Sequence, residues 1–262
     1  MSRLRLFMFL ALVLFGQSAL ASLLITPFRI VLNDNERTAT VTIINNGTET
    51  NSYRIEAIDK YQTPDGKYHA VENAQQSQAQ NFMKDWVYVR PRQVTLAPGQ
   101  KQQVRLSIRR PIGIANGEYR THLSFSELPK GKRFDPNPQG AKFQLFMLTT
   151  FTIPVQYRQG FVAPQVSIST PIVTQKEGQD VLALRLQTDG KFAAFGSLKI
   201  YSNDGDVIKE LSNVAVYPEN KIRDILMPIE LEKFRNKPLL LQYQGHKLSG
   251  VRLYNEIGFS IP

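Results

Sequence analysis

Short stretches in which apolar and polar residues alternate, each ended by turn-forming residues, run through almost the whole chain. In residues 37–45 (R-T-A-T-V-T-I-I-N), Ala39, Val41 and Ile43 alternate with threonines, and Asn45-Asn46-Gly47 follows as a strong turn signal. Because successive side chains of a strand point to opposite faces of a sheet, this pattern predicts half-buried strands. There is no long helical pattern and no βαβ rhythm, so the sequence predicts an all-β fold built of sandwiches.

The strands fall into two groups, and Gln159–Pro164 (Q-G-F-V-A-P) is the best candidate for the boundary between them. Before it, turns at sandwich-like intervals separate about seven strands. After it, Asn203-Asp204-Gly205 is a hairpin turn within a second run of short strands. We therefore predict two β-sandwich domains, residues 22–158 and residues 159–262.

Residues 1–21 have the composition of a secretory signal peptide. Arg3 and Arg5 form a basic start, Leu6–Phe15 is an apolar run, and Ala19-Leu20-Ala21 is a cleavage site. The apolar run is short for a membrane span, and no other long uncharged apolar stretch follows it. We expect export, cleavage and a mature protein that is not membrane-embedded. The alternative is an uncleaved anchor.

The chain contains no cysteine, although an exported protein could form disulfides. This absence excludes thiol catalysis, cysteine-ligated zinc and iron–sulfur clusters. The formal net charge is +10, and it falls to +8 when Arg3 and Arg5 leave with the signal peptide. Because an exported protein rarely meets nucleic acid and the cations are spread along the chain, the charge favours acidic protein partners over nucleic acid.

Sequence signatures of catalysis are absent. The chain has no G-x-S-x-G, no H-E-x-x-H, no phosphate-binding loop and no dinucleotide fingerprint. His69, His122 and His246 lie far apart, and none has a metal-ligating neighbour in the sequence. Asp204-Gly205-Asp206 lacks the rest of a calcium loop. We therefore predict a protein that is not an enzyme and that uses no cofactor, metal or nucleotide.

Residues 143–158 (F-Q-L-F-M-L-T-T-F-T-I-P-V-Q-Y-R) have a strand pattern that is apolar on both faces from Leu145 to Leu148. A half-buried strand in a sandwich normally has one polar face, so something must cover the second face here. The preceding segment, Pro129–Lys142, is basic, rich in Pro and Gly, and typical of a loop. Two interpretations remain open: a fully buried central strand, or a strand whose apolar side chains await a partner.

Leu23–Leu32 is predicted to be an apolar strand interrupted by Pro27, and Arg29 stands inside it in the sequence F-R-I-V-L. A charge there is costly unless it is paired or reaches solvent. Its side chain either points outward or forms an anion clamp that holds a carboxylate through paired hydrogen bonds. Arg120, in G-E-Y-R-T-H-L-S-F, raises the same question, as does the Arg90/Arg92 pair around Pro91.

Several of these stretches together resemble the PapD-like periplasmic chaperones of bacterial chaperone–usher pili. The most specific is the pattern V-x-P-x-x-V-x-L-x-P-G-x-x-Q-x-V-R-L, which residues 89–106 match. The resemblance covers nearly the whole first domain, but in the second domain it rests on little beyond Y-N-E-I-G (Tyr254–Gly258). The other matching segments are Thr26–Leu32, Thr38–Asn46, Gly117–Pro129 and Thr152–Arg158.

The resemblance implies two immunoglobulin-like sandwiches set at an angle, with a cleft between them. It also implies that strand 143–158 is a donor strand. Its apolar face would insert into the groove of a pilus subunit that lacks its own last strand. The donor residues would be Phe143, Leu145, Met147 and Thr149.

Arg29 matches the cleft arginine of this family, which grips the C-terminal carboxylate of the subunit. The second family anchor is a lysine on the donor strand; its place falls at Pro154 or its neighbours, where no lysine is present. Arg120 is the expected substitute, and the missing lysine resembles the divergent branches of the family. An interdomain charge cluster that orients the domains is implied at Glu127, Arg158 and Glu256.

The function implied is that of a non-catalytic periplasmic chaperone for pilus or fimbrial subunits, which it would deliver to an outer-membrane usher without nucleotide. One alternative is an exported β-sandwich adhesin or fibre subunit. Such a subunit should carry its own donor extension after the signal peptide, and here Ser22–Thr26 leads directly into a strand. A second alternative, a secreted glycan-active enzyme, needs two facing carboxylates, and nothing in the sequence suggests them.

Overall fold

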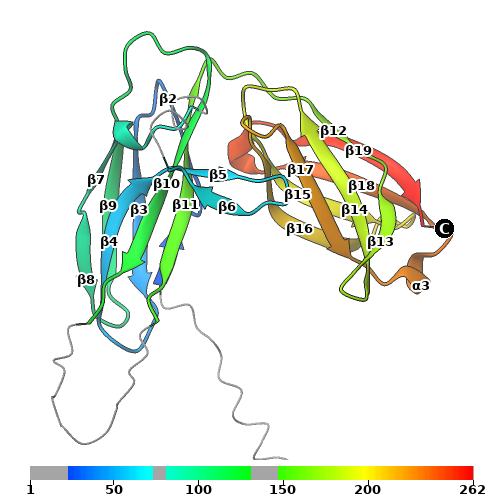
Figure 1. Ribbon diagram of the computed structural model, residues 1–262, viewed down its shortest axis with the longest axis horizontal. Coiled ribbons are helices and arrows are strands. Elements are labelled where there is room, and N and C mark those ends of the chain that lie inside the picture. The colour runs from blue at the N-terminus through cyan, green and yellow to red at the C-terminus, as the bar shows by residue number, and fades with distance from the viewer. Residues whose placement is uncertain (1–22, 73–80, 131–146, 262) are drawn as a thin grey trace, which may run out of the picture.

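The computed structural model describes residues 23–72, 81–130 and 147–261, which form two immunoglobulin-like β-sandwiches set at an angle (Figure 1). The predicted all-β fold is confirmed. The sheets of the first sandwich contain strands between Leu23 and Gln159, and those of the second contain strands between Val166 and Ser260. The last strand of the first sandwich thus ends at Gln159, and the first strand of the second begins at Val166. The predicted signal peptide lies outside the described residues.

The N-terminal sandwich packs a four-stranded sheet against a five-stranded sheet. The strands of the first, in spatial order, are β1 (Leu23–Thr26), β3 (Thr38–Asn45), β9 (Lys101–Ile108) and β7 (Val87–Arg90). Those of the second are β2 (Ile30–Asn33), β11 (Thr150–Gln159), β10 (Gly117–Glu127), β4 (Asn51–Ile58) and β8 (Gln93–Leu96). β2 and β11 pair in parallel, and the other described pairs of both sheets are antiparallel.

The apolar stretch 23–32 consists of two strands that belong to opposite sheets. β1 ends at Thr26 and β2 begins at Ile30. Pro27 has no N–H to donate to a sheet, so the chain leaves one sheet there and crosses to the other. Arg29 therefore lies on the crossing segment next to β2, which corrects its predicted position inside a strand.

Alternate residues of β11 face two different surroundings. Ile153, Val155 and Tyr157 are buried in the core of the N-terminal sandwich. Gln156 and Arg158, between and after them, make hydrogen bonds in the contact region between the two sandwiches, which we call the joint. The period of two along this strand is what allows one segment to serve both the core and the joint.

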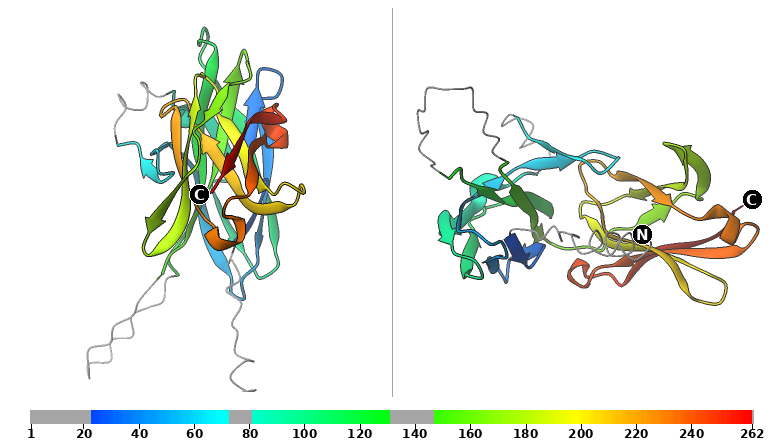
Figure 2. Two further views of the ribbon diagram at one scale, coloured as in Figure 1. Left: turned by 90° about the vertical axis from the view of Figure 1, so that its right-hand side faces the viewer. Right: turned by 90° about the horizontal axis from the view of Figure 1, so that it is seen from below.

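A hairpin formed by β5 (Lys60–Gln62) and β6 (Tyr68–Ala70) reaches from the first sandwich to the second (Figure 1; Figure 2, right). The turn Pro64-Asp65-Gly66 lies at its tip. There the Pro64 carbonyl oxygen accepts hydrogen bonds from the Asp224 amide at 2.7 Å and from Arg223 Nη1 at 2.9 Å. The hairpin is therefore attached to both sandwiches.

The C-terminal sandwich contains two further sheets with a separate apolar core. In one, β14 (Gln179–Thr188) pairs with β12 (Val166–Ile168), β13 (Ile172–Lys176) and β17 (Ile222–Pro228). In the other, the order is β16 (Val207–Val216), β15 (Ala194–Tyr201), β18 (Pro238–Gly245) and β19 (Leu253–Ser260). The predicted turn at residues 203–205 connects β15 to β16, and Gly205 there has the positive φ of +88° that this turn requires.

Helical structure in the described residues is limited to single turns: η1 (Lys84–Trp86), α3 (Leu231–Phe234) and η2 (Lys247–Ser249). Trp86 of η1 packs against Tyr119, with 4.8 Å between the ring centroids. Within the described part of the chain, no helix has the length and apolar character to cross a bilayer.

Candidate functional site

A cleft of about 920 Å³ lies between the two sandwiches. One wall is formed by the crossing segment between β1 and β2 and by the beginning of β11. The other wall is formed by β15, β16 and the loop that contains η2. Arg29, Lys199 and Lys247 contribute side chains to the lining, and no aspartate or glutamate is among the described lining residues. The cleft is therefore suited to an anionic group.

Arg29 is half-buried at this cleft and makes contacts only with uncharged groups among the described residues. Its Nη1 donates hydrogen bonds to Gln156 Oε1 at 2.8 Å and to the Tyr217 hydroxyl at 3.4 Å. Its guanidinium carbon lies 4.1 Å from the centroid of the Phe195 ring, a cation–π contact. Burial works to lower the pKa of Arg29, but Tyr217, Tyr68 and Glu118 together outweigh it, and the pKa is raised above its ordinary value. Arg29 is thus a permanent cation that forms no ion pair with a carboxylate of the described residues.

Gln156 links Arg29 to the joint. Its Nε2 donates to Glu118 Oε1 at 2.6 Å, and Arg158 Nε donates to Glu118 Oε2 at 3.0 Å. Arg158 Nη1 in turn donates to the Ser249 carbonyl oxygen of the second sandwich at 2.9 Å. Gln156, Glu118 and Arg158 are all buried. A continuous hydrogen-bonded chain therefore connects the cleft arginine to the contact between the domains.

Arg120, the expected second anchor, is placed differently from the sequence-based expectation. It is buried, its Nε donates to Glu219 Oε2 at 3.2 Å, and Nη2 forms an ion pair with the same carboxylate. The guanidinium also lies 4.1 Å from the centroid of the Tyr217 ring. Because Glu219 already neutralises Arg120, and because Arg120 is not among the cleft-lining residues, we assign it to the joint rather than to carboxylate binding.

The predicted charge cluster of Glu127, Arg158 and Glu256 does not come together. Arg158 pairs with Glu118 instead. Glu127 ends β10, whereas the joint lies at the other end of that strand, where Glu118 is. Glu256 accepts a hydrogen bond from Gln242 at 2.8 Å on the exposed face of the C-terminal sandwich. Only Arg158 of the three lies in the joint, and its partner Glu118 is the residue directly opposite it on the neighbouring strand β10.

The predicted donor segment is described only in part. Phe143 and Leu145 lie outside the described residues. Met147 is 84% exposed, Leu148 is 50% exposed, and the Thr149 carbonyl oxygen accepts a hydrogen bond from the Glu127 amide at 3.0 Å. Residues 147–149 have no regular secondary structure, and β11 begins at Thr150, whereas the predicted strand spans residues 143–158 without a break.

The outer edge of β11 is covered over part of its length. β2 pairs with residues 155–158 of β11, whereas residues 150–154 have a described strand partner only in β10. Thr152, Ile153 and Pro154 from this uncovered part also line the cleft. The uncovered edge and Arg29 therefore belong to one continuous surface.

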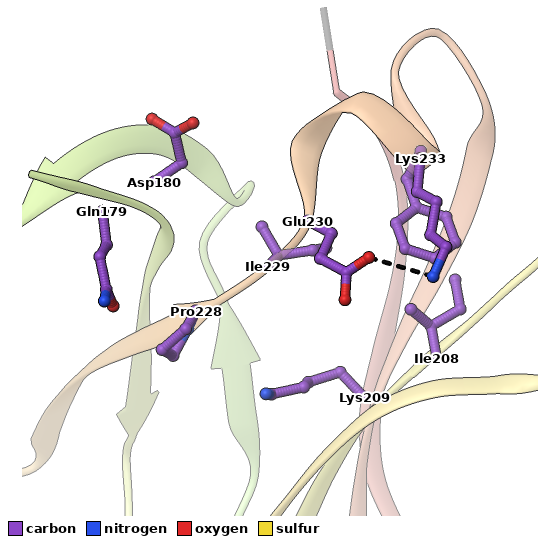
Figure 3. Close-up of a pocket in the computed structure, with 9 residues that line it drawn as sticks. Gln179, Asp180, Ile208, Lys209, Pro228, Ile229, Glu230 and Lys233 are labelled. Carbon is purple, nitrogen blue, oxygen red and sulfur yellow. Dashed lines mark ion pairs between the residues drawn. The ribbon is translucent and has the colours of Figure 1, made fainter. Parts of the chain in front are cut away.

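Elsewhere, a second hollow of about 550 Å³ lies at the far end of the C-terminal sandwich (Figure 3). Its charges are mixed, and Lys233 Nζ and Glu230 Oε2 form an ion pair at 3.0 Å beside it.

Arg90 and Arg92, which the sequence analysis also considered as anion-binding residues, are not among the cleft-lining residues. In the described part of the chain, no group of three or more His, Asp or Glu side chains is arranged to hold a metal ion.

Sequence reasoning missed the residues that complete the site, namely Glu118, Gln156, Lys199, Tyr217, Glu219 and Lys247. Glu118 had a local signal, because two charges lie close together in the strand sequence G-E-Y-R. The others come from distant parts of the chain and have no local signal of a shared role. Only the fold brings them together.

No protein-family model matches this chain, and no curated protein sequence matches it. Similar solved structures include the CsuC–CsuE chaperone–tip adhesion subunit complex of Acinetobacter baumannii, at 15% identity and a TM-score of 0.49 over 91% of this chain and 98% of that chain. The complex of SafA pilin with the SafB chaperone of Salmonella enterica matches at 13% identity and a TM-score of 0.49, over 93% and 98% of the two chains. The CupB2 chaperone of Pseudomonas aeruginosa matches at 12% identity and a TM-score of 0.48, over 91% and 100%. At identities and TM-scores this low, the similarity does not establish a function for this chain.

Proposed function

We propose that this protein is a periplasmic chaperone that binds pilus or fimbrial subunits, completes their fold by donor-strand complementation and delivers them to an outer-membrane usher. The likeness of residues 89–106 and of the segment around Arg29 to chaperone sequences supports the proposal. The observation that carries it is that Arg29, a half-buried cation without a carboxylate partner among the described residues, lines a cleft beside the uncovered edge of β11.

In this proposal, the C-terminal carboxylate of the subunit enters the cleft and binds Arg29. Arg29 donates its hydrogen bonds to described residues from Nη1, so Nε and Nη2 have N–H groups available for a two-pronged contact with a carboxylate. A carboxylate there also supplies the charge partner that a half-buried guanidinium otherwise lacks.

The chain of the subunit then runs along β11 and pairs with its uncovered edge, as in other cases of strand addition. Main-chain hydrogen bonds fix the register, and the exposed side chain of Met147 enters the groove of the subunit. Full burial of a large apolar side chain contributes about 1.5–3 kcal/mol before the cost of ordering. Covering the edge also prevents unpaired strands from associating with one another.

The proposal is tested by co-expressing the protein with a candidate pilus subunit and measuring the amount of subunit that co-purifies. Replacing Arg29 by Ala should weaken binding by about 2–5 kcal/mol, because the carboxylate loses its charged partner in a partly buried site. Arg185→Ala is the matched control, since Arg185 forms an exposed ion pair with Asp224 inside the C-terminal sandwich. Recovery of the subunit with Arg29→Ala at the wild-type yield would refute the proposed clamp.

The alternative of an adhesin or fibre subunit makes a different prediction for the protein alone. A fibre subunit should assemble with itself, so light scattering of the purified protein should reveal polymers that grow with time. A chaperone should remain at a small, fixed oligomeric size until a subunit is added.

A further inference from the structure

The cleft contains cations from both domains. Arg29 lies on the N-terminal wall, and Lys199 and Lys247 lie on the C-terminal wall. β11 offers no lysine, because Pro154 occupies the position where one is expected from the resemblance. Apart from Arg29, the cations among the described lining residues belong to the second sandwich. A second cation that contacts an anion bound at Arg29 therefore comes from that sandwich.

The two lysines differ in their partners. Lys199 Nζ lies 3.6 Å from Glu210 Oε2, so a carboxylate of its own domain already partly neutralises it. Lys247 is exposed and has no carboxylate partner among the described residues. Lys247 is therefore the more available cation on this wall.

The backbone that carries Lys247 is held in place on both sides. The Leu248 amide donates to His246 Nδ1 at 3.1 Å, the Ser249 amide donates to the His246 carbonyl oxygen at 2.8 Å, and Gly250 ends the turn with a φ of +77°. Arg158 of the N-terminal sandwich also donates to the Ser249 carbonyl oxygen. The joint thus fixes the position of the Lys247 backbone relative to Arg29, which reduces the ordering cost of binding.

The cleft also exposes two large apolar side chains, one on each wall. Phe28 is 70% exposed and Leu248 is 43% exposed, and each is next in sequence to one of the cations, Arg29 and Lys247. An anion that carries an apolar side chain beside its charge fits this arrangement better than a small inorganic anion does. The end of a polypeptide with an apolar last residue has this chemistry.

We propose that Lys247 supplies the second cationic contact to the polypeptide C-terminus held by Arg29, so that one terminal carboxylate bridges both sandwiches, with Phe28 and Leu248 on either side of the last apolar side chain. The proposal rests on the proposed function, because it assumes that a chain terminus enters the cleft. It places part of the partner-binding site on the C-terminal domain and makes the site depend on the joint.

The test uses a fluorescein-labelled peptide of alternating Val and Thr that ends in Phe, made once with a free C-terminal carboxylate and once as the C-terminal amide. Binding is measured by fluorescence anisotropy. The wild-type protein should bind the acid more tightly than the amide. Lys247→Ala should weaken binding of the acid about three- to tenfold and leave binding of the amide unchanged, because only the charge contact is lost. Lys247→Arg should restore most of the preference for the acid.

Lys209→Ala is the matched control, because it removes a lysine of the same domain that lines the hollow in Figure 3 instead of the cleft. Phe28→Ala should weaken acid and amide alike. If Lys247→Ala keeps the full preference for the acid while Arg29→Ala loses it, the inference about Lys247 is wrong and the proposed function stands. If the wild-type protein binds acid and amide equally, the carboxylate site of the proposed function fails as well.

Discussion

Arg120 and Arg158 each have a carboxylate partner, whereas Arg29 contacts an amide, a hydroxyl and an aromatic ring. Burying a cation without a counter-charge is costly. Glu219 and Glu118 supply the counter-charges for Arg120 and Arg158 within the joint. For Arg29, the proposed function supplies the counter-charge as the terminal carboxylate of a partner. The roles of the three therefore follow from their partners, although the side chains are chemically identical.

At this scale, Gln156 should matter for both stability and binding. Replacing it with Leu removes the contact to Arg29 and leaves Glu118 Oε1 without its 2.6 Å hydrogen bond, in a buried position. We expect the free energy of unfolding in urea to fall by about 1–3 kcal/mol. Gln175→Leu, which removes an exposed amide, should change it by less than about 0.5 kcal/mol. Equal effects of the two substitutions would contradict a role for Gln156 in the joint.

His122 should make the fold sensitive to mild acid. Burial, followed by the charges of Arg120, Lys60 and Arg29, lowers the pKa of His122 well below its ordinary value, and the Tyr68 ring packs against the imidazole. The folded protein therefore binds the proton at a lower pH than the unfolded chain does. As the pH falls below about 6.5, the unfolded state gains protons first, and stability should fall by at most about 1.4 kcal/mol per pH unit from this group.

Urea unfolding of the wild-type protein and of His122→Leu, measured between neutral and mildly acidic pH, checks this expectation. The loss of stability on acidification should be smaller in the variant than in the wild type. The same loss in both proteins would show that other groups cause it.

The sequence indicated part of this chemistry and missed the rest for a physical reason. Arg29 could be singled out because a charge inside an apolar stretch must have a partner or reach solvent. Its role could not be distinguished from those of Arg120 and Arg158, because Glu219 follows Arg120 by 99 residues and Gln156 follows Arg29 by 127 residues. Such partners are set by tertiary structure and leave no pattern in a single sequence.

At the scale of elements, strands with clear alternation and turn residues were predicted well, and short or two-sided ones were not. The strand at residues 38–45 and the turn at residues 203–205 follow from local patterns. β6 has only three exposed residues, and β13 is largely exposed, so neither has an apolar face that a pattern can reveal. The pattern predicts the apolar stretch 23–32 as one strand, because a pattern does not show which sheet each half joins.

The hairpin of β5 and β6 leads to a prediction for Gly66. A Cβ at Gly66 would overlap the Arg223 guanidinium, and the residue has a φ of +88°. Gly205 has the same φ but open space around it, so Gly205→Ala should cost about 1–2 kcal/mol from backbone strain alone. Gly66→Ala should cost more, because the Arg223 guanidinium has to move away from the Pro64 carbonyl oxygen, and the attachment of the hairpin to β17 should weaken.

The rate of hydrogen exchange of the Asp224 amide, which donates to the Pro64 carbonyl oxygen, reports how firmly the hairpin is attached to β17. Its exchange should accelerate in Gly66→Ala and remain at the wild-type rate in Gly205→Ala. Unchanged exchange in Gly66→Ala would mean that the hairpin does not depend on the contact with Arg223.

At the scale of the whole molecule, the joint couples two sandwiches that have separate cores. The ion pairs of Arg120 with Glu219 and of Arg158 with Glu118 are nearly inaccessible to solvent, and the former crosses from one sandwich to the other. Losing one partner of such a pair leaves a buried charge and costs about 3–5 kcal/mol. The two domains should therefore unfold together only while these pairs are intact.

Differential scanning calorimetry tests this coupling. We expect a single transition for the wild-type protein and two separated transitions for Glu219→Gln, in which Arg120 loses its counter-charge. Glu230→Gln removes an exposed ion pair inside the C-terminal sandwich and should keep the single transition. Two transitions in the wild-type protein would show that the joint does not unite the domains thermodynamically.

Because β11 contributes side chains both to the core and to the joint, few of its positions can change without a structural cost. From residue 153 to residue 158, its odd-numbered side chains fill the core and its even-numbered ones face the cleft or the joint, so a substitution on either side disturbs a structural function. Ahead of Thr150, Met147 and Leu148 are exposed, so substitutions there do not disturb the core or the joint. Under the proposed function, inherited changes that alter partner preference can accumulate at these two positions, while the remainder of the strand tolerates few.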